Sequence, residues 1–176
     1  MNHSHRTLTS LLITVTAGTL LLMGCGTDDE SPRSTEPSTP STVDTNSADT
    51  VAVEALARIF SWRPADEPQG GSLARARDLL GPTLLTVVDG YASDSAPPRT
   101  SLQWAHWRDT GARVDAFTFA SAEPSGDTDP ARIQHRKIGI EQTVVYPDGD
   151  TESLPPTAVI ATLIRTSDGW RLDTYQ

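Results

Sequence analysis

The chain has 176 residues, a formal net charge of −9 and a single cysteine. The acidic balance argues against nucleic-acid binding, which needs a basic face, and the lone cysteine excludes an internal disulfide bond. The sequence has neither metal-ligand spacing nor a phosphate-binding glycine loop, so we expect no metal and no cofactor.

Residues 1–24 have the features of an export signal. A short basic start precedes residues 8–23, which carry no charge and are fewer than the roughly 20 residues of a membrane-spanning helix. The run ends in Leu22-Met23-Gly24-Cys25, which resembles the lipobox of bacterial lipoproteins. The resemblance implies cleavage between Gly24 and Cys25, and lipidation of Cys25, whose acyl chains give a stable anchor. We therefore expect a cell-membrane lipoprotein on the extracytoplasmic face; the alternative is an unmodified cysteine after an ordinary signal.

Residues 25–49 are predicted to be a disordered tether that begins at the lipidated cysteine. The segment is rich in Ser, Thr, Pro and acidic residues and has no aromatic residue, so it buries too little apolar surface to fold. About 24 such residues reach on the order of 27 Å. Residues 50–176 hold every aromatic residue of the chain and are predicted to form one domain.

The first half of this domain favours three amphipathic helices. The first is capped by Asp49 or Thr50 and ends before Pro64. The second follows Ser72 as its N-cap and runs to Leu80, and a third starts at Gly81-Pro82 and continues to Tyr91.

The second half favours four strands, over residues 113–120, 133–146, 157–166 and 170–175. Alternation places Phe117 and Phe119 on one face of the first strand. In the second strand the apolar phase shifts close to Gly139, which indicates a bulge there.

Helices followed by antiparallel strands predict an α+β domain, with three N-terminal helices on a curved four-stranded sheet. This order, the long strands, and the closing Asp168-Gly169-Trp170-Arg171-Leu172 resemble NTF2-like domains. They are similar to the VirB8-like and TcpC-like envelope proteins of conjugation and secretion machines, as is Trp104-x-x-Trp107 followed by Gly111-Ala112-Arg113-Val114. Those proteins are usually held by a transmembrane helix, whereas this chain has a lipobox.

NTF2-like folds often enclose a pocket between sheet and helices, and SnoaL-like enzymes of this type place His and Asp in it. Acid–base chemistry needs a neighbouring pair of such groups, and no pair is marked by spacing here. We therefore predict no catalytic residue. The candidate pocket or interaction residues are Trp104, His106, Trp107, Asp115 and Glu141, with Tyr91, His135 and Tyr146 as further titratable groups.

Two clusters have both a structural and a functional interpretation. Trp104 and Trp107 form a core or pocket-mouth pair, or an exposed pair that binds a partner. Arg132, Arg136 and Lys137 form a solvated strand edge, or a basic patch for a partner or lipid headgroups.

Two functions follow from these features. The first is a non-catalytic interaction module with a protein partner in the envelope, with a place in a conjugation or secretion assembly as one form of it. The second is a lipid-tethered small-ligand binder or SnoaL-like enzyme that uses the pocket. The oligomeric state is left open.

Overall fold

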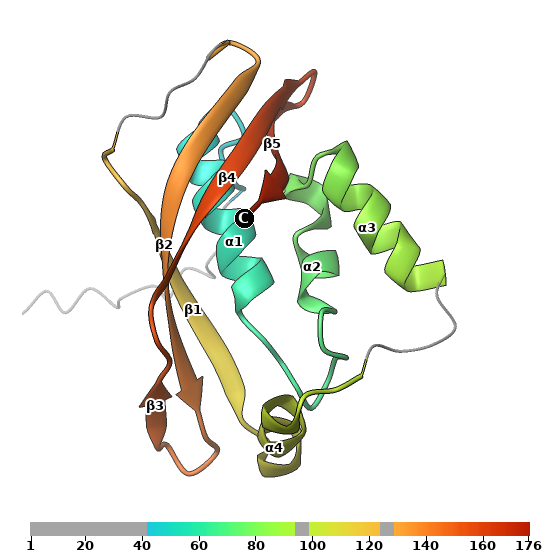
Figure 1. Cartoon of the computed structure of the whole chain (residues 1–176), viewed down its shortest axis with the longest axis vertical. Helices are drawn as coiled ribbons and strands as arrows, with labels where there is room; N and C mark the ends of the chain where they lie inside the picture. Colours follow the sequence, from blue (N-terminus) through green and yellow to red (C-terminus); the bar gives the residue numbers. More distant parts are fainter. Residues whose placement is uncertain (1–41, 94–98, 124–128) are drawn as a thin grey trace, which may run out of the picture. The chain divides into compact units, whose positions relative to one another are not determined.

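The computed structural model describes residues 42–93, 99–123 and 129–176. The chain divides into two units, residues 1–39 and 40–176, and every described residue belongs to the second. These residues form a curved antiparallel sheet with the helices on one side of it (Figure 1), which confirms the α+β class. Within the described ranges no helix is both long and apolar enough to cross a membrane.

The helical elements precede the sheet in the chain. They are α1 (Ala48–Phe60), α2 (Ser72–Arg75), the 3-10 turn η1 (Arg77–Leu79), α3 (Pro82–Ser93) and α4 (Leu102–Thr110). The three predicted helices correspond to α1, to α2 with η1, and to α3. Helix α4 was not predicted.

The sheet has five strands, one more than predicted. They are β1 (Arg113–Ala120), β2 (Ile133–Val145), β3 (Thr151–Ser153), β4 (Thr157–Thr166) and β5 (Gly169–Tyr175). The order is β1-β2-β4-β5, and β3 pairs with the end of β2. The additional strand is only three residues long, so it is too short for an alternating pattern to reveal it.

The core lies between α1 and the inner face of the sheet. Helix α1 contacts β1, β2 and β5, and its stripe of Val51, Ala55 and Leu56 is fully buried. Alternate residues of the strands meet this stripe, as expected for a sheet with one face on the core. The inner-face residues are Ile138, Ile140, Val159, Ala161, Leu163, Trp170 and Leu172.

The folded part begins before residue 50, so the predicted tether does not extend to residue 49. Ser47 caps α1 by accepting a hydrogen bond from the Thr50 N–H at 3.2 Å, where the sequence indicated Asp49 or Thr50. The Trp170 N–H donates to the Thr45 carbonyl at 2.7 Å, and Val43 packs against the core. These contacts order polar residues because the edge of β5 offers them backbone partners.

The predicted bulge at Gly139 is wrong. Phe119, Gly139 and Ala158 pair across three strands in unbroken register. The apolar phase shifts because Ile133 faces the opposite side of the sheet and is exposed. The ring of Phe119 lies where a Cβ atom of residue 139 would be, so a side chain at this position would displace the ring.

A register shift lies instead between β4 and β5, where Asp173 is the extra residue. A bulge of this kind re-aims the side chains around it. The Asp173 carboxylate accepts hydrogen bonds from the N–H and the hydroxyl of Thr83, at 3.0 and 2.8 Å, near the start of α3. Beyond the shift, Tyr175 pairs with Ala161 and shares the inner side with Leu172.

The contact of Thr45 with β5 predicts that a side chain at position 169 destabilises the fold. This glycine has φ of +108°, and a Cβ atom there would lie 2.5 Å from the Thr45 carbonyl oxygen. We expect Gly169→Ala to lower the free energy of unfolding by about 1–3 kcal/mol, as measured by urea denaturation. Gly90→Ala is the control, because Gly90 lies within α3 with open space around it and should gain up to about 1 kcal/mol. Equal effects of the two substitutions would contradict the contact with Thr45.

Candidate binding pocket

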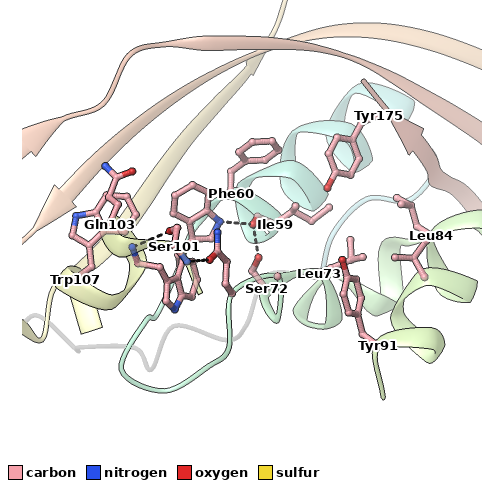
Figure 2. A pocket seen from close by; sticks show the side chains of 15 residues that line it. Ile59, Phe60, Ser72, Leu73, Leu84, Tyr91, Ser101, Gln103, Trp107 and Tyr175 are labelled. Carbon is pink, nitrogen blue, oxygen red and sulfur yellow. Dashed lines mark hydrogen bonds between the residues drawn. The ribbon is translucent and has the colours of Figure 1, made fainter. Parts of the chain in front are cut away.

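A pocket of about 410 Å³ opens between the helices and the end of β5. Figure 2 shows its two walls, with Trp107 and Ser101 on one side and Tyr91, Leu84 and Tyr175 on the other. Its volume lies within the range of about 300–1,000 Å³ that is typical of small-molecule sites. The lining residues are Ile59, Phe60, Trp62, Gln69, Gly70, Ser72, Leu73, Leu84, Val87, Tyr91, Ser101, Gln103, Trp104, Trp107 and Tyr175.

Three indoles make the first wall. The ring of Trp62 lies 5.8 Å from those of Trp104 and Trp107, measured between ring centroids. Contacts of this kind contribute about 0.5–1.5 kcal/mol each beyond burial. Trp62 is held in place because its indole N–H donates to the Ile59 carbonyl at 3.1 Å. Its backbone also pairs with Val114 of β1, through hydrogen bonds of 2.8 and 3.0 Å.

Helix α4 brings the other two indoles to this wall. Ser101 caps the helix by accepting from the Trp104 N–H at 3.1 Å, and Gly111 ends it with φ of +70°. Residues three apart on a helix share a face, so both indoles point the same way and both are only 4% exposed. The Ser101 N–H donates to the Gln69 side chain at 2.9 Å, which joins α4 to the loop before α2. Ser101 and Gly111 were the sequence signals that could have predicted this helix.

Tyrosines and aliphatic residues make the second wall. Tyr175 meets Phe60 edge to face, with ring centroids 5.9 Å apart. Burial raises the pKa of the Tyr175 hydroxyl above its ordinary value, and Tyr91 raises it further. Burial does this because a phenolate is poorly solvated among apolar groups, so the wall presents a neutral hydroxyl.

The pocket carries no ionisable side chain other than these tyrosines. None of its fifteen lining residues is Asp, Glu, His, Lys or Arg. Its polar groups are the amides of Gln69 and Gln103 and several hydroxyls, of which Ser72 already donates to the Ile59 carbonyl at 2.7 Å. Such a surface favours neutral, flat or apolar groups and offers no carboxylate–imidazole pair for proton transfer.

The structure separates the residues that the sequence singled out. Trp104, Trp107 and Tyr91 line the pocket, and both tryptophans are buried as a core or pocket-mouth pair requires. His106 lies on the exposed side of α4 and does not line the pocket. Glu141 is exposed on the opposite face of the sheet, because its neighbour Ile140 is an inner-face residue.

The remaining titratable candidates also lie outside the pocket. Asp115 accepts hydrogen bonds from Arg63 at 3.1 Å and from Arg113 at 3.0 Å. Tyr146 donates to Glu152 at 3.3 Å, and His135 lies on β2. These groups therefore do not converge on one centre.

The predicted basic cluster does not form a single patch. Consecutive strand residues point to opposite faces, so Arg136 turns toward α1, where it pairs with Asp49. Lys137 lies on the outer face and pairs with Glu123 at 2.8 Å. Arg132 precedes β2 and is exposed.

The described residues contain no group of three or more His, Cys, Asp and Glu side chains placed to hold a metal ion. Gly24 and Cys25, the predicted cleavage and lipidation site, lie outside the described residues. Their roles stay predictions.

Comparison with known proteins gives one structural likeness. No family model and no curated protein matches the chain. The fold is similar to the crystal structure of an IcmL-like type IV secretion system protein from Legionella pneumophila subsp. pneumophila str. Philadelphia 1, with 12% sequence identity and a TM-score of 0.49. The match covers 73% of this chain and 87% of that one. A likeness at this level does not assign a function to the chain.

The environment of Tyr175 predicts a pH dependence of stability. Its raised pKa means that the neutral hydroxyl stabilises the fold fully below the ordinary tyrosine pKa of about 10. This contribution is lost as the pH rises through the raised value. In a titration followed by tyrosinate absorbance, we expect the late-titrating signal to come from Tyr175 and Tyr146, whose pKa is raised by burial and by Glu152.

Tyr175→Phe should remove half of that late signal, and Tyr146→Phe the other half. The stability of Tyr175→Phe should also fall less steeply than that of the wild type as the pH rises above about 10. A late signal that Tyr175→Phe leaves unchanged would contradict the buried position of the hydroxyl.

Proposed function

We propose that the chain is a membrane-anchored envelope lipoprotein whose NTF2-like domain is a non-catalytic binding module for a neutral, largely apolar ligand. The observation that carries this proposal is the pocket of about 410 Å³ without a charged lining residue. An enzyme of the SnoaL-like kind would need proton-transfer groups in the pocket, and His106, Asp115 and Glu141 lie outside it.

The ligand chemistry follows from the walls. Trp62, Trp104 and Trp107 offer indole surfaces for a flat or aliphatic body. The hydroxyls of Tyr91 and Tyr175 offer hydrogen bonds to a neutral polar group such as a carbonyl or an ether oxygen. An anionic ligand would leave water without gaining a cationic partner, which is unfavourable.

Filling the pocket should abolish this binding. Val87 lines the pocket from α3 and is partly exposed, so Val87→Trp should place an indole in the opening without disturbing the core. Binding of the neutral probe N-phenyl-1-naphthylamine, followed by its fluorescence, should weaken by about tenfold or more, which corresponds to about 1.4 kcal/mol. Thr86→Trp is the control, because Thr86 is the exposed neighbour on the same helix and does not line the pocket.

The preference of the pocket for neutral ligands provides a second test of the proposal. The related sulfonate probe 8-anilinonaphthalene-1-sulfonate should bind more weakly than the neutral one. Tighter binding of the sulfonate, or equal binding of the neutral probe to both tryptophan variants, would refute the pocket as a site for neutral ligands.

The anchor is tested separately at Cys25. Cys25→Ser removes the thiol that receives the lipid, so we expect an unprocessed precursor that takes up no labelled fatty acid. The measurement is metabolic labelling followed by electrophoresis of the membrane fraction. Normal labelling of Cys25→Ser would overturn the lipoprotein assignment and leave the pocket proposal intact.

A place in a conjugation or secretion assembly, with a protein partner in the envelope, stays a prediction from the resemblance to VirB8-like and TcpC-like proteins. Extraction in mild detergent that yields no co-purifying envelope protein would count against it. Ligand binding by the pocket would be unaffected by that result.

A further inference from the structure

The outer face of the sheet carries an apolar patch. Phe117 and Phe119 are 65% and 44% exposed, and Ile160 is 39% exposed. Together with Ala158, which is also exposed, these residues are called the outer patch. In Figure 1 the helices lie on the other side of the sheet, so no described helix covers the patch.

A depression adjoins Phe119 and Ala158 of the outer patch. Phe119, Gly139 and Ala158 lie in one row across β1, β2 and β4, and the ring of Phe119 leans over Gly139. A depression of about 300 Å³ lies over this row, bounded by Phe119, Lys137, Glu141 and Pro156 among others. Phe119 lines the depression, and the ring centroid of Phe117 lies 5.9 Å from that of Phe119.

The charges around the depression are self-complementary. Lys137 and Glu141 lie two residues before and two residues after Gly139 on the same strand, so both point to the outer face. Lys137 pairs in register with Ile160, and Glu141 with Phe117. A two-fold axis along the Phe119–Gly139–Ala158 row, lying between two facing sheets, would place each Lys137 opposite the Glu141 of the other copy.

We propose that the outer patch docks a second copy of this chain, face to face, about this two-fold axis. An isologous contact requires a surface that is complementary to itself, and the paired lysine and glutamate meet that condition. The same axis places Phe119 opposite Phe119 of the other copy, so two exposed rings would face each other. An axis along β2 would instead oppose lysine to lysine and glutamate to glutamate. This proposal does not depend on the pocket.

The proposed contact between two copies is small, so we expect it to be weak. Eight paired residues of β1 and β2, at about 3.3 Å each, and three strands at about 4.8 Å spacing project roughly 400 Å². Stable complexes bury about 800 Å² on each partner. A small contact suits a chain held by the lipid anchor proposed above, on which this step rests, because such an anchor raises the effective concentration of the copies.

Co-purification of two copies of the full chain tests the docking. Both copies are expressed together with different epitope tags placed within residues 30–40, cross-linked in the membrane, and extracted in mild detergent. We expect Phe117→Asp and Phe119→Asp to lower recovery of the second tag by about tenfold. Leu102→Asp is the control, because Leu102 is 92% exposed and lies on α4, away from the outer patch. Circular dichroism of each variant checks that it is folded.

The charge pair tests the two-fold arrangement. Lys137→Glu and Glu141→Lys should each lower recovery of the second tag, and the double exchange should restore most of it. Glu123→Gln removes the partner of Lys137 within the chain and should leave recovery unchanged.

Several outcomes overturn the proposal. They are a wild-type chain that recovers no second tag, patch variants that behave like Leu102→Asp, and a double exchange that falls below both single variants. Recovery of a different protein, lost in the patch variants, would assign the outer patch to that partner and would also refute docking of a second copy.

Discussion

The pairing of Trp62 with Val114 joins the parts on which the pocket depends. Two backbone hydrogen bonds hold Trp62, the second residue after α1, against the first strand of the sheet. They satisfy backbone groups at the edge of β1, which would otherwise be open to another strand. The same residue supplies the indole between Trp104 and Trp107. The end of α1, the edge of the sheet and the aromatic wall are therefore positioned by one contact.

At the opposite edge of the sheet, backbone groups are likewise paired with segments outside the sheet. On β5, Thr45 accepts from the Trp170 N–H, and the Gly81 N–H donates to the Leu172 carbonyl at 2.7 Å. Asp173 bulges outward between the strand and α3, where it binds Thr83. The bulge also turns Tyr175 inward, so the second wall of the pocket depends on the closure of this edge. Both walls thus depend on contacts that cover the edges of the sheet, whereas no described helix covers its outer face.

Strong periodicity made most of the fold predictable. The limits of β1 and β4 are those that alternation predicted. Helix α4 was missed because its nine residues carry a mixed, polar pattern, and its caps were not used. The bulge was placed at Gly139 because one exposed isoleucine mimics a phase shift. The true bulge at Asp173 leaves no pattern in the local sequence, because it depends on the contact of Asp173 with the start of α3.

The candidate site was predictable only in part. Trp104, Trp107 and Tyr91 were singled out and line the pocket. Trp62, Tyr175 and Gln69 were not identified as pocket residues, because contacts between segments far apart in the chain bring them together. The titratable candidates His106, Asp115 and Glu141 were chosen by residue type. Their positions along the helix or strand direct their side chains away from the pocket.

The most direct test of the pocket as a binding site uses its tryptophans. Trp62, Trp104 and Trp107 line it, whereas Trp170 lies in the core beneath Arg165. In an NMR titration of the nitrogen-15-labelled protein with a neutral aromatic compound, the indole N–H signals of the first three should shift and that of Trp170 should stay. A shift confined to Trp170, or no indole shift at saturating compound, would contradict the proposed binding function.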